Sequence, residues 1–110
     1  MEITRRNVKN AVVVSVKGRL DAVTSPDFEK ELTEVIAQGE TLLVLDFGHL
    51  DYISSAGLRT VLATTKRLKE KQGKLYLSSL KDMVKEVFEI SGFSTIIPIY
   101  ESLDVALSEI

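Results

Sequence analysis

Two hydrophobic patterns alternate along this chain, and their alternation constrains the fold more than any other feature of the sequence. Short apolar runs typical of β-strands occur at residues 11–16, 41–47, 74–78 and 95–100, with a weaker run at 2–8. Between them, apolar residues recur every three or four positions, which predicts amphipathic helices over residues 25–38, 56–72, 80–90 and 103–110. Strands that alternate with helices favour a mostly parallel sheet with right-handed crossovers.

The predicted fold is a single α/β domain over residues 1–110, with a mixed sheet of four or five strands and four helices mainly on one face. A turn near Lys9–Asn10 joins the first two strands as a hairpin, which makes the sheet mixed. The runs at 11–16 and 41–47 are apolar almost throughout, as expected for strands covered on both faces. Pro98 cannot donate to a strand ladder, so the last strand is expected either to lie at an edge or to end at Pro98.

Three signals predict where helices begin and end. Ser25 is placed as an N-cap with Pro26 as the first helical residue, and Gly39 is placed to end that helix. Ser79 with Asp82 resembles a capping box before the third helix.

The composition excludes several classes of function. The chain has no cysteine, which excludes disulfides, cysteine nucleophiles and thiolate metal sites, and its only histidine is His49. Net charge is −2, from 14 basic and 16 acidic residues, which argues against direct nucleic-acid binding. No run approaches the roughly 20 apolar residues of a membrane span, and the start lacks a signal peptide. The absence of both leads us to expect a cytoplasmic location. No phosphate-binding glycine motif is present, so we expect no cofactor.

The stretch Gly48–Arg59 is the most unusual part of the sequence. Ser54, Ser55, Ala56 and Gly57 stand where the second helix should begin. On a purely structural interpretation, one serine caps that helix, and the small residues let it pack closely on the sheet. On a functional interpretation, the free N–H groups and positive dipole end of the helix favour a phosphate, so a serine here is a candidate phosphorylation site.

A second loop, residues 17–24, follows the strand at 11–16. Both loops lie at carboxyl ends of parallel strands, where open α/β sheets usually bind their ligands. Asp21 is therefore expected near Ser54 and Ser55; the alternative is a solvated loop carboxylate.

These segments carry a resemblance to a known family. Gly18–Ala22 (GRLDA), Leu45–Phe47 (LDF) and Leu50–Arg59 (LDYISSAGLR) resemble the anti-sigma factor antagonists of the STAS domain family. The similarity continues through Gly73–Leu77 (GKLYL) and Val87–Phe93 (VFEISGF), so it covers nearly the whole chain and implies a STAS fold.

The resemblance implies a regulatory switch that works by exchange of partners. In the family, the unphosphorylated antagonist binds an anti-sigma factor that is also a serine kinase, which frees the sigma factor. Phosphorylation then releases the antagonist, and a phosphoserine phosphatase resets the switch. The family's acceptor serine corresponds to Ser55; Ser54, at a position where Asp is commonest, is the second choice.

The resemblance also implies a partner-binding surface. Its expected residues belong to the loop that carries the family's aspartate and to the start of the second helix: Asp21, Ser54, Ser55, Gly57, Leu58 and Arg59.

Two other readings remain open at this point. One is a non-switching STAS interaction module or scaffold in a stress-signalling complex; the lack of a membrane span argues against the transporter version of that family. A small hydrolase using Ser55, His49 and Asp51 is disfavoured, because these residues are nearly consecutive and no G-x-S-x-G elbow is present. We therefore expect no catalytic residue, no metal site and no enzymatic activity.

Overall fold

Five strands form one sheet, and their order across the sheet is their order along the chain. In the computed structural model, which describes residues 1–110, the strands are β1 (Glu2–Val8), β2 (Ala11–Leu20), β3 (Leu42–Ile53), β4 (Lys74–Ser78) and β5 (Ile99–Tyr100). β1 pairs with β2 in antiparallel fashion, and all other pairs are parallel. The mixed α/β sheet predicted from the sequence is confirmed. The last strand lies at an edge as predicted, but it is shorter than the predicted residues 95–100, because only Ile99 and Tyr100, after Pro98, pair with β4.

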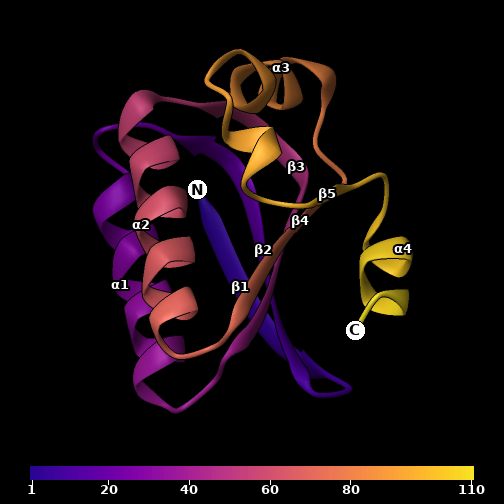
Figure 1. The fold of residues 1–110 in the computed structure, drawn as a ribbon. Helices are drawn as coiled ribbons and strands as arrows, with labels where there is room; N and C mark the ends of the chain where they lie inside the picture. The colour runs from indigo at the N-terminus through magenta and orange to yellow at the C-terminus, as the bar shows by residue number, and fades with distance from the viewer.

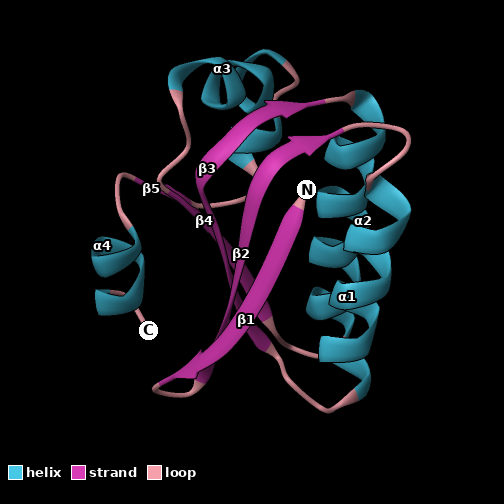
Figure 2. Cartoon of the chain, turned by 180° about the vertical axis from the view of Figure 1, so that it is seen from behind, coloured by secondary structure: helices cyan, strands magenta, loops and turns pink.

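Helices cover the sheet unequally. They are α1 (Ser25–Ala37), α2 (Ser55–Glu70), α3 (Asp82–Ile90), a 3-10 turn η1 (Phe93–Thr95) and α4 (Leu103–Ser108). α1 and α2 lie side by side on one face, α4 lies on the opposite face, and α3 sits beyond the end of β3 (Figures 1 and 2). The four predicted helices, mainly on one face, are confirmed; η1 was not predicted.

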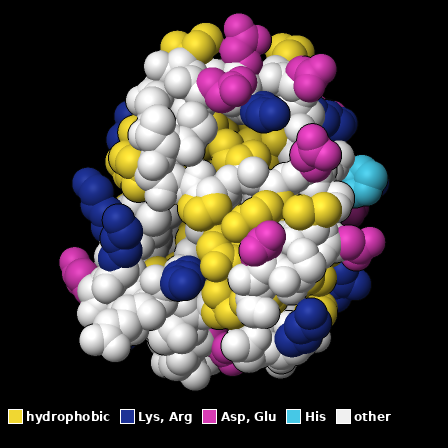
Figure 3. Space-filling model, turned by 45° about the vertical axis from the view of Figure 1, so that its right-hand side comes forward, with side chains coloured by type: hydrophobic (Ala, Val, Ile, Leu, Met, Phe, Trp, Pro, Cys, Tyr) yellow, Lys and Arg dark blue, Asp and Glu magenta, His cyan; other side chains and the backbone are white.

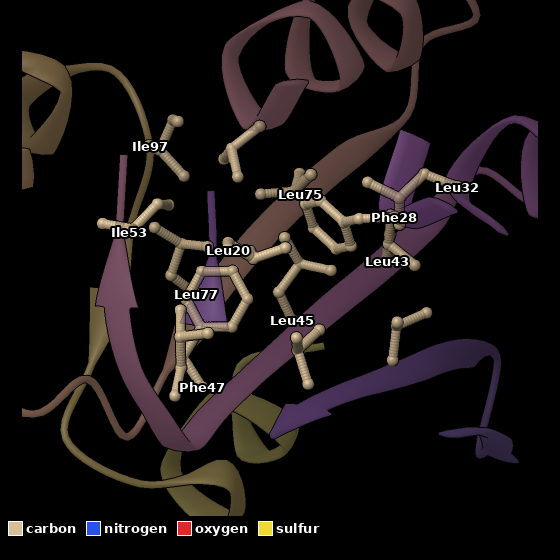
Figure 4. Packing of buried hydrophobic residues seen from close by; sticks show 14 of the residues in the cluster. Leu20, Phe28, Leu32, Leu43, Leu45, Phe47, Ile53, Leu75, Leu77 and Ile97 are labelled. Carbon is tan, nitrogen blue, oxygen red and sulfur yellow. The ribbon is translucent and has the colours of Figure 1, made fainter. Parts of the chain in front are cut away.

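The core is divided into two clusters by the sheet. The larger one lies under α1, α2 and α3, and Figure 4 shows Leu20, Phe47 and Leu77 of three neighbouring strands turned toward a shared centre. The smaller one lies under α4, where Ala106 packs with Val13 and other buried residues. Because both faces are covered, β2 and β3 are apolar at consecutive positions, as their sequences indicate.

β2 and β3 continue together beyond the rest of the sheet. β4 pairs with β3 only over Leu42–Asp46, whereas β2 pairs with β3 as far as Leu20 and Ile53. β1 ends its pairing with β2 at Lys17, so residues 18–20 and 50–53 form a two-stranded extension, here called the β2–β3 ribbon, which curves over the starts of α1 and α2 (Figure 2).

The length of this ribbon corrects two predicted boundaries. The sequence predicted strands over residues 11–16 and 41–47, followed by loops over 17–24 and 48–59, but β2 runs to Leu20 and β3 runs to Ile53. Shifts in the pairing register allow the continuation, and Asp46 stabilises the irregular point: its Oδ1 accepts the N–H of Gly48 at 3.0 Å. Polar residues on the exposed side concealed the strand, while Leu50 and Ile53 are buried on the other side.

Two predicted helix starts are also wrong. Ser25 is the first residue of α1 rather than its N-cap, which is Thr24. Ser79 makes no capping box, because its backbone is left-handed (φ 64°) and the N-cap of α3 is Lys81. The predicted role of Gly39 is confirmed, since it follows the C-cap of α1 with φ 91°.

Candidate functional site

The carboxyl ends of β2 and β3 meet the starts of α1 and α2 at one end of the molecule. A hydrogen bond continues the pairing of the two strands into this region: the N–H of Ser54 donates to the carbonyl oxygen of Leu20 at 2.7 Å. The loop that contains Asp21 begins at the next residue. The two segments that the sequence predicted to converge therefore lie side by side.

Ser54 is committed to the helix start. Its backbone is extended (φ −90°, ψ 175°), and its half-buried Oγ accepts the N–H of Gly57 at 3.4 Å. Its carbonyl oxygen accepts the N–H of Leu58 at 2.9 Å, which opens the helical ladder. Ser54 is thus the N-cap of α2. The sequence predicted that one of the two serines would cap this helix, and the structure shows that it is Ser54.

Ser55 is free by comparison. It is the first residue of α2, its side chain is exposed, and its hydroxyl takes part in no hydrogen bond within the chain. The first N–H groups of a helix have no partners within it, so a negative charge on this side chain would be favoured by the dipole of α2. The geometry offers an external enzyme an accessible hydroxyl at a helix N-terminus.

Gly57 and Leu58 point inward from the same turn. A Cβ on Gly57 would lie 2.9 Å from Cγ1 of Ile53 and 3.1 Å from Cβ of Leu20. Only glycine therefore lets α2 start this close to the ribbon. Leu58 is buried in the larger core cluster. The structure brings both residues beside Ser55 but turns them toward the protein rather than toward solvent.

Asp21 organises its own loop. Its Oδ1 accepts the N–H groups of Val23 and Thr24, each at 3.0 Å, and the Thr24 hydroxyl at 3.2 Å. The hydrogen bond from the Thr24 amide, reinforced by the Thr24 side chain, the Val23 amide and Arg19, holds the pKa of Asp21 below its ordinary value of 3.8. Asp21 therefore stays ionised near neutral pH and is more than a solvated carboxylate.

A groove of about 330 Å³ runs between the starts of α1 and α2. Arg59, which is exposed, lines it from α2, and Glu29 and Ser25 line it from α1. The hydroxyl of Ser25 is buried without a hydrogen-bond partner, which leaves one polar group in the groove unsatisfied. Arg59 thus joins the region predicted for it, at the rim of a concave surface.

Sequence reasoning missed two features of this region. Val23 is 84% exposed at the loop that Asp21 organises, an apolar residue with nothing to cover it. On the ribbon, the guanidinium of Arg19 lies 4.2 Å from the ring centre of Tyr52. The contact between Arg19 and Tyr52 depends on the register between β2 and β3, which the sequence does not reveal. The exposure of Val23 could have been predicted, because it is an isolated apolar residue in a polar loop.

Asp51 on the ribbon is paired with a cation. Lys81 donates to its Oδ1 at 2.5 Å, and this bond together with the charge of Lys81 lowers the pKa of Asp51 below 3.8. His49 lies on the same strand, but no hydrogen bond joins it to Asp51 or Ser55. The arrangement that a Ser-His-Asp hydrolase requires is not formed.

The structure contains neither a membrane-spanning helix nor a cluster of metal-binding side chains. The helices include none with the length and apolar content required to cross a lipid bilayer. No three His, Asp or Glu side chains lie close enough together to hold a metal ion.

Comparison with known proteins places this architecture. BtrV of Bordetella bronchiseptica, a proposed anti-sigma factor antagonist, is 42% identical over 106 residues, which cover 96% of this chain and 91% of BtrV. The crystal structure of an anti-sigma factor antagonist from Mycobacterium paratuberculosis superposes with a TM-score of 0.91 at 27% identity, covering 98% of this chain and 92% of that one. The Bacillus cell fate determinant SpoIIAA in its phosphorylated form shares the fold, with a TM-score of 0.79, 22% identity and 98% of each chain covered. The model of the STAS domain matches residues 2–106, and this chain therefore belongs to the STAS domain family.

Proposed function

We propose that this chain is an anti-sigma factor antagonist whose binding is switched by phosphorylation of Ser55. In its unphosphorylated form it binds an anti-sigma factor that is also a serine kinase, and thereby frees a sigma factor. The proposal rests on family membership, on the names of the relatives above, and on one observation: the Ser55 hydroxyl is exposed and unbonded, whereas the Ser54 hydroxyl caps α2.

The phosphoryl transfer requires only the hydroxyl from this chain. The kinase supplies ATP; the Ser55 oxygen forms a bond to the γ-phosphorus, the bond from that phosphorus to the oxygen bridging to the β-phosphate breaks, and ADP leaves. The hydroxyl proton passes to a base of the kinase. This chain contributes no catalytic residue and no cofactor, and a phosphoserine phosphatase reverses the modification.

The added charge explains why binding would stop. A neutral Ser55 can be buried against a partner at little cost, whereas a phosphate carries about −1.5 to −2 charges that must be desolvated. Asp21, ionised near neutral pH, lies in the adjoining loop and adds like-charge repulsion. In the free protein the same phosphate is stabilised by the dipole of α2, so phosphorylation weakens the complex without unfolding the helix.

The proposed partner surface follows from what is exposed around Ser55. It comprises the Asp21 loop with Val23 at its surface, the Ser54–Ser55 turn, and Arg59 beside the groove between α1 and α2. Gly57 and Leu58 take part by setting the position of α2 rather than by direct contact. We propose no contact with nucleic acid or membrane and a cytoplasmic site of action.

The test uses the anti-sigma factor kinase encoded in the same genome, with ATP, and intact-protein mass spectrometry. Wild type and Ser54→Ala should each gain one phosphoryl group, and Ser55→Ala should gain none. Ser55→Asp should weaken kinase binding by orders of magnitude, because a few kcal/mol are lost on burying its charge. Full phosphorylation of Ser55→Ala would overturn the assignment. A stable complex with no phosphorylation of wild type would instead favour the non-switching interaction module.

A further inference from the structure

The edge of β4 is left partly without a neighbouring strand. β5 pairs only with Leu77 and Ser78, so the stretch from Lys74 to Tyr76 has β3 on one side and no strand on the other. The N–H of Lys74 points toward β3, where it donates to the carbonyl oxygen of Thr41. The backbone N–H and C=O groups of successive strand residues point to opposite sides, so those of Leu75 point toward the open edge.

Pro98 explains why the chain does not close this edge itself. Leu77 donates to the carbonyl oxygen of Pro98, in the register Leu77↔Ile99. In a parallel ladder of that register, the preceding bond to the carbonyl oxygen of Leu75 would come from the N–H of residue 98, and proline has none. The matching bond from Leu75 to Ile96 is not formed either. The β4–β5 ladder therefore begins at Leu77 and does not include Leu75.

A groove of about 290 Å³ lies along this open edge. Its floor includes Leu75 and Tyr76, and its far wall includes Ile96 and Pro98, both of them exposed apolar side chains. Figure 3 shows hydrophobic side chains gathered in a hollowed band on this side of the molecule, with Lys or Arg side chains beside them. An exposed strand edge beside an apolar groove is the arrangement that binds extended peptides.

The charged residues of the groove are all cationic. Lys69 of α2 and Lys74 of β4 line it, both are exposed, and no acidic residue lines it. Neither lysine belongs to either of the two ion pairs of the structure, Arg5–Glu31 and Lys81–Asp51. The groove therefore complements an acidic group carried by whatever occupies it.

We propose that this edge binds an extended segment of a protein partner, in which an Asp or Glu is flanked by apolar residues. The segment adds a short strand in line with β5: its backbone bonds to Leu75, its acidic side chain meets Lys69 and Lys74, and an apolar side chain enters the groove between Tyr76 and Ile96. The site is separate from Ser55, since it lies against the last turns of α2 rather than its start. It stands whether or not Ser55 is a phosphorylation site.

The test selects a phage-displayed library of random octapeptides on the folded wild-type protein. The enriched peptides should carry Asp or Glu between apolar residues. In spectra of the 15N-labelled protein, the synthetic peptide should shift the amides of Lys74–Tyr76, Ile96–Ile97 and Ile99–Tyr100, and it should slow hydrogen exchange at Leu75. A double variant, Lys69→Glu with Lys74→Glu, should weaken binding by about tenfold or more, whereas Lys30→Glu on the exposed side of α1 should not.

A second variant tests the backbone separately from the charges. Pro98→Ala supplies the N–H that the chain lacks at this position. The pairing of β5 with β4 should then extend to Leu75, which would weaken peptide binding although both lysines remain. Enriched peptides without acidic residues, binding that survives the double lysine variant, shifts confined to the start of α2, or failure to enrich any peptide would overturn the proposal. A concentration-dependent dimer that the double variant abolishes would assign the edge to a second copy instead.

Discussion

The backbone N–H of Ser54 donates to the carbonyl oxygen of Leu20 at 2.7 Å, so the N-cap of α2 is hydrogen-bonded to the last residue of β2. The two residues are more than thirty positions apart in the chain. This bond brings the serine that caps the helix, the serine beside it and the loop organised by Asp21 into one small region. Each of the following predictions tests a contact in this region or within α2.

Ser54→Ala should destabilise the protein, and Ser55→Ala should not. Removing the Ser54 hydroxyl leaves the N–H of Gly57 without its cap, and the bond is long (3.4 Å), so we expect a loss of about 0.5–1 kcal/mol in the free energy of unfolding. The unbonded Ser55 hydroxyl should change it by less than about 0.5 kcal/mol. Urea unfolding at neutral pH measures both, and equal effects of the two substitutions would contradict the division of roles.

Gly57→Ala should destabilise the protein although alanine is the better helix former. The new methyl group would lie 2.9 Å from Ile53 and 3.1 Å from Leu20. Crowding of this kind costs about 1–3 kcal/mol, against a helix-propensity gain of about 1 kcal/mol. A net loss of up to about 2 kcal/mol follows. Ala63→Gly, at an exposed position of the same helix, measures the propensity contribution alone. A stabilised Gly57→Ala would show that the close approach is not limiting.

Asp21 should make stability depend on acid pH. Its pKa is lowered in the folded state, so its charge stabilises the fold above its unfolded pKa of about 3.9, and that contribution is lost as pH falls through the lower folded value. Asp21→Asn keeps an oxygen acceptor but no charge. The difference in urea midpoint between wild type and Asp21→Asn should therefore be constant near neutral pH and shrink below about pH 4. A difference unchanged down to pH 3 would count against it.

Thr64→Val should leave the protein as stable or make it more stable. Thr64 is 3% exposed, and its hydroxyl donates to the carbonyl oxygen of Thr60 at 2.8 Å. That carbonyl oxygen also serves the helical ladder, so the substitution leaves no buried group unsatisfied and removes one buried hydroxyl. We expect a gain of up to about 1 kcal/mol by thermal or urea unfolding. Thr64→Ser keeps the hydroxyl, loses the methyl group and should destabilise.

Local patterns were sufficient to predict much of this fold. The apolar runs of β2 and β3 and the spacing of Phe28, Leu32 and Val35 predicted the alternation of strands and helices, because burial and periodicity are properties of neighbouring residues. The limits of β2 and β3 were predicted less well. Leu50 and Ile53 are strand residues whose pairing depends on Gly18 and Leu20, and no local pattern encodes that register.

The candidate site shows the same division. The sequence places two serines at a helix start, but it does not say which one caps the helix. That is decided by the extended backbone of Ser54 and the direction of its side chain toward Gly57. The burial of Gly57 and Leu58 and the exposure of Val23 likewise depend on how the ribbon folds over α2. Family resemblance identified the region, and tertiary packing distinguishes its members.

The β2–β3 ribbon carries the serine turn and is itself part of the core. Beyond Asp46, β3 has β2 as its only strand partner, yet Leu20, Leu50 and Ile53 of the ribbon are buried in the larger core cluster. A paired insertion of two residues in both strands would keep each side chain on its side of the ribbon, but it would move these three residues out of their packing. The position of the serine turn above the sheet is therefore set by the same contacts that stabilise the fold, and it can change only if the core changes with it.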